Sequence, residues 1–159
     1  AILDSAIRES LAEPDFDENI GLASIRVNPA MPVHSYAQLT ALILRQSAAV
    51  REYELGAFQK AVETRSYSGT SSLKEAGTIY KKIEAALLAV DVPANLATNH
   101  LAVINSIGSL ANIVNAMAVW EGDPVTGLVY IDTFLEKESQ VEQTVMELFA
   151  KITAVLKTS

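Results

Sequence analysis

The chain has 159 residues, half of them hydrophobic, and a net charge of −7 from 12 basic and 19 acidic side chains. A chain of this length and hydrophobic content can bury a core of its own, which excludes general disorder. The acidic balance disfavours nucleic acid and anionic membranes as partners, and the absence of cysteine excludes disulfides, zinc–thiolate sites and thiol catalysis.

The first 34 residues predict a short helix followed by an irregular segment. Leu3, Ile7 and Leu11 are spaced four residues apart, which predicts an amphipathic helix over residues 2–11. Residues 13–34 contain three prolines and a glycine, which argue against a helix. Because structureless loops of this length are uncommon, we expect this segment to pack against the rest of the domain.

The remaining sequence predicts four longer helices, because apolar residues recur at steps of three and four. Their expected ranges are 35–65, 71–90, 93–122 and 123–155. Asp123 and Pro124 have the residue types of an N-cap and a first helical position.

Short connections make each of these helices an antiparallel neighbour of the next. The expected fold is therefore all-α, an up-down-up-down four-helix bundle. We expect a single domain over residues 1–159, in which the helix and irregular segment of residues 1–34 accompany a four-helix core of residues 35–159.

Residues 93–120 contain no acidic residue, lysine or arginine. On a helical wheel, Asn105, Ser109 and Asn112 form a neutral polar stripe opposite the apolar face. An ordinary exposed helix would carry charges there, so we expect the stripe to be partly covered by the first helix, the irregular segment or another chain. A hydrated or internally hydrogen-bonded face is the alternative.

Trp120 falls beside this stripe and off the main apolar face. Aromatic anchors dominate the energetics of protein interfaces. Asn105, Ser109, Asn112 and Trp120 are therefore the candidate residues for contact with a partner, while covering by the chain's own irregular segment is the competing interpretation.

The two histidines do not predict a metal site. His100 falls on the shoulder of the apolar face, where a core or boundary role is expected. Helical di-iron proteins place a glutamate three residues before each histidine ligand, but Met31 and Ala97 occupy those positions before His34 and His100.

Other chemical motifs are incomplete. Residues 15–21, DFDENIG, begin like a calcium loop, but Ile20 and Arg26 stand where that loop needs glycine and glutamate. Residues 71–74 match S-x-x-K without its companion motifs. The carboxylates of the expected helices over residues 35–65 and 123–155 are expected on solvated faces, and so are Lys81, Lys82 and Lys137. We therefore expect no catalytic, cofactor or metal site, and no enzyme.

Several short motifs carry a resemblance. Val92 to Leu96, His100-Leu101, Ile104 to Ser106 and Asp123-Pro124 are similar to segments of uncharacterised helical proteins from small-genome candidate-phylum bacteria. The resemblance covers about a third of the chain. It implies an extracytoplasmic domain that follows an N-terminal membrane anchor and serves as an accessory of a secretion or pilus apparatus.

The chain begins at Ala1 without a methionine, which we interpret as a shortened or mature form with a leader or anchor upstream.

The incomplete chemical motifs and the neutral stripe together predict a non-enzymatic interaction or structural domain with a protein partner and no cofactor. The alternative is a carrier of a small apolar ligand between the helices, because the fourth helix has small residues that could leave space.

Overall fold

The structure is a computed structural model that describes residues 15–50, 53–65 and 70–159, most of which are helical. The amphipathic helix expected over residues 2–11 lies outside the described residues. In the described part, the α-helices are α2 (Val33–Leu44), α3 (Glu54–Thr64), α4 (Thr70–Leu88), α5 (Ala97–Ala118) and α6 (Pro124–Lys157). Short 3-10 turns occur at Leu22–Ser24, Arg45–Ala49 and Ala94–Leu96.

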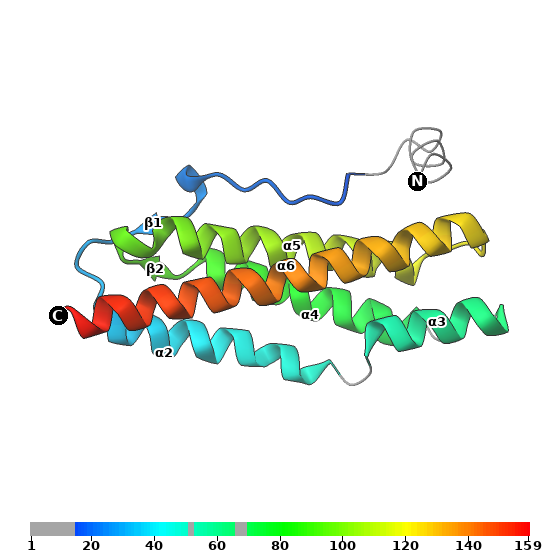
Figure 1. Cartoon of the computed structure of the whole chain (residues 1–159), viewed down its shortest axis with the longest axis horizontal. Coiled ribbons are helices and arrows are strands. Elements are labelled where there is room, and N and C mark those ends of the chain that lie inside the picture. Colours follow the sequence, from blue (N-terminus) through cyan, green and yellow to red (C-terminus); the bar gives the residue numbers. More distant parts are fainter. Residues whose placement is uncertain (1–14, 51–52, 66–69) are drawn as a thin grey trace.

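The helices lie along one long axis of the molecule (Figure 1). α4, α5 and α6 lie side by side, and α2 and α3 follow one another along the remaining side. An all-α fold was expected, and the described residues agree with it except for one short sheet.

The expected helix over residues 35–65 is interrupted. Arg45–Ala49 forms a 3-10 turn and Val50 is extended, so α2 and α3 are separate helices. Ser47 contributes to the break, because its hydroxyl donates to the carbonyl of Leu44 at 2.8 Å, which competes with the regular backbone bonds of a helix.

Strand β1 (Arg26–Val27) pairs in parallel with β2 (Asp91–Val92) at one end of the molecule. The Arg26 guanidinium binds the Asp91 carboxylate at 2.9 Å, and the Asn28 amide donates to the same carboxylate at 3.1 Å. This ladder fixes the irregular segment beside the connection between α4 and α5.

Helix α5 is the central element, because it contributes to both clusters of the hydrophobic core. One cluster joins its first half to α2 and the end of α6, and the other joins its second half to α3 and the start of α6. Among the described residues, Ala94–Ala118 is the one helix long and apolar enough to cross a membrane, and 67% of its most apolar window is buried inside the domain. Burial on most sides accounts for its lack of charge.

Helix α6 begins as its sequence predicts. The Asp123 carboxylate accepts a hydrogen bond from the Thr126 backbone amide at 2.9 Å, and Pro124 occupies the first turn. Because the N-terminal amides of a helix lack intrahelical partners, this cap satisfies one of them.

Replacing Leu148 with alanine should lower the free energy of unfolding by about 2–5 kcal/mol, because this fully buried α6 side chain would leave a cavity. Met146→Ala is the matched control, because Met146 is 72% exposed on the same helix, and it should cost about 0.5 kcal/mol or less. Urea denaturation measures both values. Equal losses would contradict the placement of α6.

Candidate functional site

The candidate site is the polar face of α5 and the extended segment bound to it. We call residues 15–20 the strap. The strap follows α5 along the top of the molecule in Figure 1. Its side chains alternate, because Phe16, Glu18 and Ile20 are half-buried whereas the residues between them are exposed. This two-residue period is typical of an extended chain with one face against a surface.

Three side chains of α5 bind the backbone of the strap. The Asn105 carboxamide accepts from the Ile20 amide at 2.8 Å and donates to the Ile20 carbonyl at 3.0 Å. The Ser109 hydroxyl accepts from the Glu18 amide at 2.9 Å, and it donates to the Asn105 carbonyl at 2.8 Å.

Asn112 completes this series by donating from its side-chain nitrogen to the Phe16 carbonyl at 3.1 Å. The strap therefore runs antiparallel to α5. Two residues of extended chain span about 6.7 Å and one helical turn about 5.4 Å, so the two repeats nearly match over this short length.

A lysine stands on either side of the strap. Lys81 of α4 binds the Glu18 carboxylate at 3.1 Å and the Glu84 carboxylate at 3.4 Å. Lys137 of α6 binds the Asp17 carboxylate at 2.6 Å. The strap is thus joined to α4 and α6 by ion pairs and to α5 by uncharged hydrogen bonds.

Lys137 is 6% exposed. Burial alone would lower the pKa of Lys137, but the carboxylates of Asp17 and Glu136 outweigh this effect and raise it. The ammonium group of Lys137 is therefore held in its charged form by the strap and by its own helix. On the other side of the strap, burial raises the pKa of Glu84, and this effect is partly offset by Lys81.

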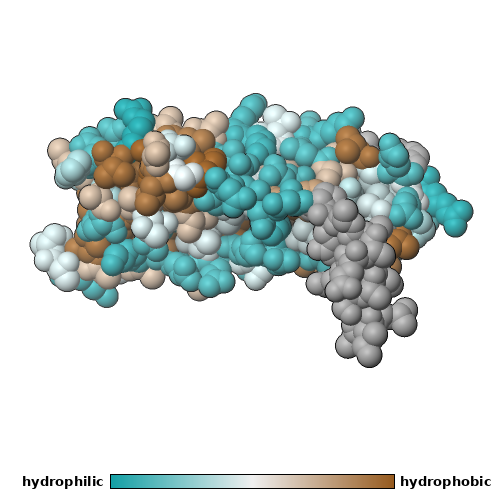
Figure 2. Space-filling view, turned by 90° about the horizontal axis from the view of Figure 1, so that it is seen from above, coloured by the Kyte–Doolittle hydropathy of each residue, from teal (hydrophilic) through white to brown (hydrophobic). Residues whose placement is uncertain are grey.

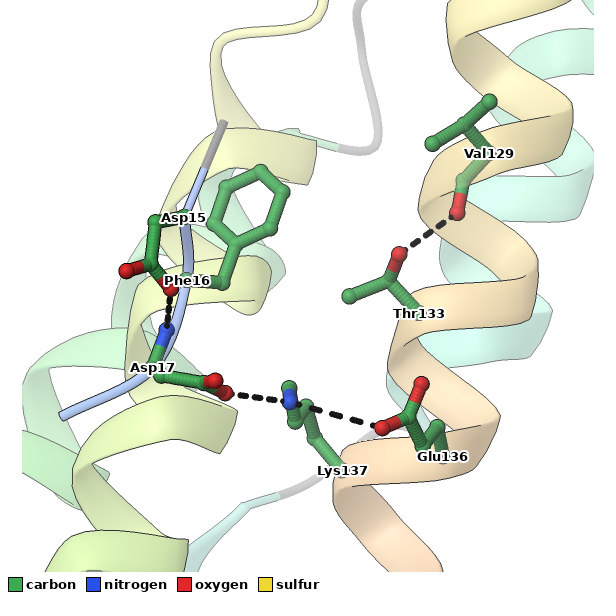
Figure 3. Close-up of a pocket in the computed structure, with 7 residues that line it drawn as sticks. All are labelled: Asp15, Phe16, Asp17, Val129, Thr133, Glu136 and Lys137. Atoms are coloured by element: carbon green, nitrogen blue, oxygen red, sulfur yellow. Dashed lines mark hydrogen bonds and ion pairs between the residues drawn. The ribbon is translucent and has the colours of Figure 1, made fainter. Parts of the chain in front are cut away.

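A cavity of about 460 Å³ lies between the start of the strap and α6 (Figure 3). Its lining residues are Asp15, Phe16, Asp17, Val129, Thr133, Glu136 and Lys137. The Phe16 ring meets the Tyr130 ring edge-on, with centroids 5.8 Å apart.

Figure 2 shows the molecule from above. The middle of the face seen there is mainly hydrophilic, and apolar surface gathers toward the end that holds β1 and β2.

Gly108 permits the close approach of the strap to α5. A Cβ atom at this position would lie 2.7 Å from Cγ and 3.0 Å from Cβ of Glu18, and it would also meet the Glu84 carboxylate. A side chain here cannot be accommodated unless both Glu18 and Glu84 move.

The structure brings together three of the four candidate contact residues. Asn105, Ser109 and Asn112 all bind the strap, as the interpretation of a stripe covered by the irregular segment requires. Trp120 lies apart at the end of α5 and is 8% exposed. Its indole packs edge-on against Phe58 at 5.4 Å, and its N–H donates to the Asp123 carbonyl at 2.9 Å.

His100 is fully buried, with both ring nitrogens in hydrogen bonds. Nε2 lies 2.9 Å from the Leu87 carbonyl, which can only accept, so Nε2 carries the proton. Nδ1 then accepts from the Tyr36 hydroxyl at 2.7 Å. Burial lowers the pKa of His100, and the bond to Leu87 opposes this effect. Within the described ranges, no group of three or more histidine or acidic side chains could hold a metal ion.

Two charged residues correct the expectation that the lysines and carboxylates lie on solvated faces. Lys137 is buried, and so is Glu54, whose carboxylate accepts from the Tyr80 hydroxyl. Lys137 lies three residues after Phe134 and four before Val141, in phase with the apolar stripe of α6. This position in the apolar stripe could have indicated that Lys137 is buried. The polar residues beside it in the sequence instead suggested a solvent-exposed segment.

No family model, curated protein or solved structure matches the chain.

Gly108→Ala should loosen the strap, because the new methyl group occupies the space of the Glu18 side chain. We expect faster hydrogen exchange at the Glu18 and Ile20 amides. Gly56→Ala is the control, because nothing lies within 4 Å of its added carbon, and it should be neutral or stabilise the protein by about 0.4–1 kcal/mol. Unchanged strap exchange in Gly108→Ala would contradict the close contact.

The burial of His100 predicts a loss of stability in mild acid. The ordinary pKa of 6.5 applies in the unfolded chain and a lower one in the folded protein. Below about pH 6.5 the unfolded state therefore binds a proton that the folded state does not, and stability falls by up to about 1.4 kcal/mol per pH unit until folded His100 protonates.

Urea denaturation between pH 7.5 and 5.5 measures this dependence. His100→Gln should remove it, although the variant is less stable overall. His34→Gln, at an exposed position of α2, should retain it. A slope that is the same in all three proteins would show that His100 is not its source.

Proposed function

We propose that the chain is a non-enzymatic interaction or structural domain that works by holding an extended peptide segment against α5. The observation that carries this proposal is the series of four hydrogen bonds between the side chains of Asn105, Ser109 and Asn112 and the backbone of the strap. Bonds to backbone groups recognise the extended conformation rather than particular side chains. In the resting chain, the strap occupies this surface.

We further propose that the architecture is an up-down-up-down four-helix bundle in which α2 and α3 together make the first member. The course of the chain in Figure 1 supports this arrangement, because α4, α5 and α6 each run back along the preceding helix. The helix contacts agree, since α5 packs on both α4 and α6. The strap covers a face of α5 that neither α4 nor α6 covers.

The burial of the ionisable residues supports a non-enzymatic role. His100 is held between Tyr36 and Leu87, and Lys137 lies between carboxylates. Both groups have structural partners. Of the two, Lys137 lines the cavity beside the strap, where its ammonium group is paired with the carboxylates of Asp17 and Glu136. The geometry therefore favours binding over catalysis.

The alternative of a carrier for a small apolar ligand needs an enclosed apolar cavity. His100 and Tyr80, which could have lined one, are instead hydrogen-bonded within the packed helices. The cavity beside the strap is lined largely by charged side chains. An interaction domain is the better-supported proposal.

For the setting, we propose an accessory role in a cell-surface or secretion assembly outside the cytoplasmic membrane. This part follows from the resemblance of the short motifs around Pro93 and His100 to helical proteins in which such a domain follows a membrane anchor. The binding surface on α5 suits such a role because assemblies are often joined through extended segments.

The double substitution Asn105→Ala and Asn112→Ala tests the proposed function. It removes three of the four hydrogen bonds, each worth about 0.5–1.5 kcal/mol, and leaves the bond between Ser109 and Glu18. We expect the Glu18 amide to exchange at least about tenfold faster, because the whole strap opens more often. Circular dichroism should remain that of a folded helical protein.

Asn95→Ala, at an exposed position before α5, is the matched control and should leave strap exchange unchanged. If Glu18 exchange is the same in the double variant as in the parent protein, the stripe does not hold the strap. The proposed function would then be rejected.

A further inference from the structure

We propose that the surface occupied by the strap is a binding site for an extended acidic segment of a second polypeptide, which takes the place of residues 15–20. This inference rests on the proposed function and specifies the partner. The partner segment would present two adjacent acidic residues between an aromatic and an aliphatic residue, as the strap does with Phe16 to Ile20.

The backbone contacts set the conformation of the partner segment. Asn105 and Ser109 accept from amides two residues apart, and Asn112 donates to a carbonyl two residues further on. Any extended chain offers these groups at this spacing. The site therefore accepts an extended segment whatever its sequence, and the flanking residues supply the selection.

The charges select for acidic residues. Adjacent side chains of an extended chain point to opposite sides, and Asp17 and Glu18 accordingly reach Lys137 of α6 and Lys81 of α4. A partner with a neighbouring pair of carboxylates would meet both lysines. A partner with lysine or arginine at these two positions would meet like charges.

Departure of the strap would not leave a buried charge without a partner. Lys81 also binds Glu84 at 3.4 Å, and Lys137 also binds Glu136 at 3.6 Å. Removing the only partner of a buried charge is costly, and here each lysine keeps a carboxylate from its own helix. Exchange of one acidic segment for another is therefore feasible.

The strap can also leave without disturbing the fold downstream. Ile25 is buried, and Arg26 is fixed to Asp91 by the β1–β2 ladder and an ion pair. Between this anchor and the strap lie exposed residues 21–24. The strap is thus a short tethered segment that competes with a partner through its high effective concentration.

The probe for the test is the peptide acetyl-DFDENIG-amide, which reproduces residues 15–21. The full chain carries Asp17→Lys and Glu18→Lys, which place like charges beside Lys137 and Lys81 and weaken the strap while leaving α5 unchanged. We expect this variant to bind the labelled peptide at least about tenfold more tightly than the parent chain does, because its site is vacant more of the time. Fluorescence anisotropy or NMR titration measures the affinity, which should fall as salt is added.

Two controls test the selection. Glu63→Lys with Glu142→Lys makes the same change of net charge at exposed positions of α3 and α6 and should bind no better than the parent chain. A peptide with lysines at the Asp17 and Glu18 positions should bind at least about tenfold more weakly to the strap-weakened variant.

The strap-weakened variant should be helical by circular dichroism, and the backbone amide of residue 18 should exchange its hydrogen faster than in the parent chain. The proposal is overturned if such a variant does not bind the peptide at millimolar concentration. Equal binding of the acidic and lysine-containing peptides would also overturn it. In either case the proposed function can survive, because that depends on faster strap exchange in the Asn105 and Asn112 double variant.

Discussion

The burial of α5 is the constraint on which the rest of the structure depends. Helix α5 carries no charged residue and is buried on most sides, and the polar side chains on its remaining face must find partners when they are covered. α4 and α6 cover two sides of α5, and the strap covers the third. The carboxamides of Asn105 and Asn112 are satisfied because an extended chain, unlike a helix, offers free backbone groups to a neighbour. The choice of strap over a further helix follows from this requirement.

The charged residues around α5 perform a related task. Lys81 and Lys137 stand at its two edges and bind the strap from opposite sides. A lysine that is almost completely buried is tolerated only with carboxylates in contact, and Lys137 has them from the strap and from its own helix. The same residues that close the side of the domain thus determine which kind of segment can lie there.

The sequence predicted the helical character and most helix positions, because period, N-cap and proline signals are local. Asp123 and Pro124 show this at the start of α6. It also predicted that the stripe of Asn105, Ser109 and Asn112 is covered. The sequence could not show which segment covers the stripe, because the contact between stripe and strap joins residues about ninety positions apart. The break after Leu44 was missed because the apolar phase continues through it, and the burial of Glu54 and Lys137 was missed because their polar neighbours dominate the local pattern.

The two-residue ladder between β1 and β2 fixes the position from which the chain runs back to the strap. Arg26 is held opposite Asp91, and the connection from there back to Ile20 includes the 3-10 turn Leu22–Ser24. The number of residues in this connection limits how far along α5 the strap can reach. Its length is therefore one of the features that bring Ile20 to Asn105, while the hydrogen bonds of α5 set which strap groups face the helix.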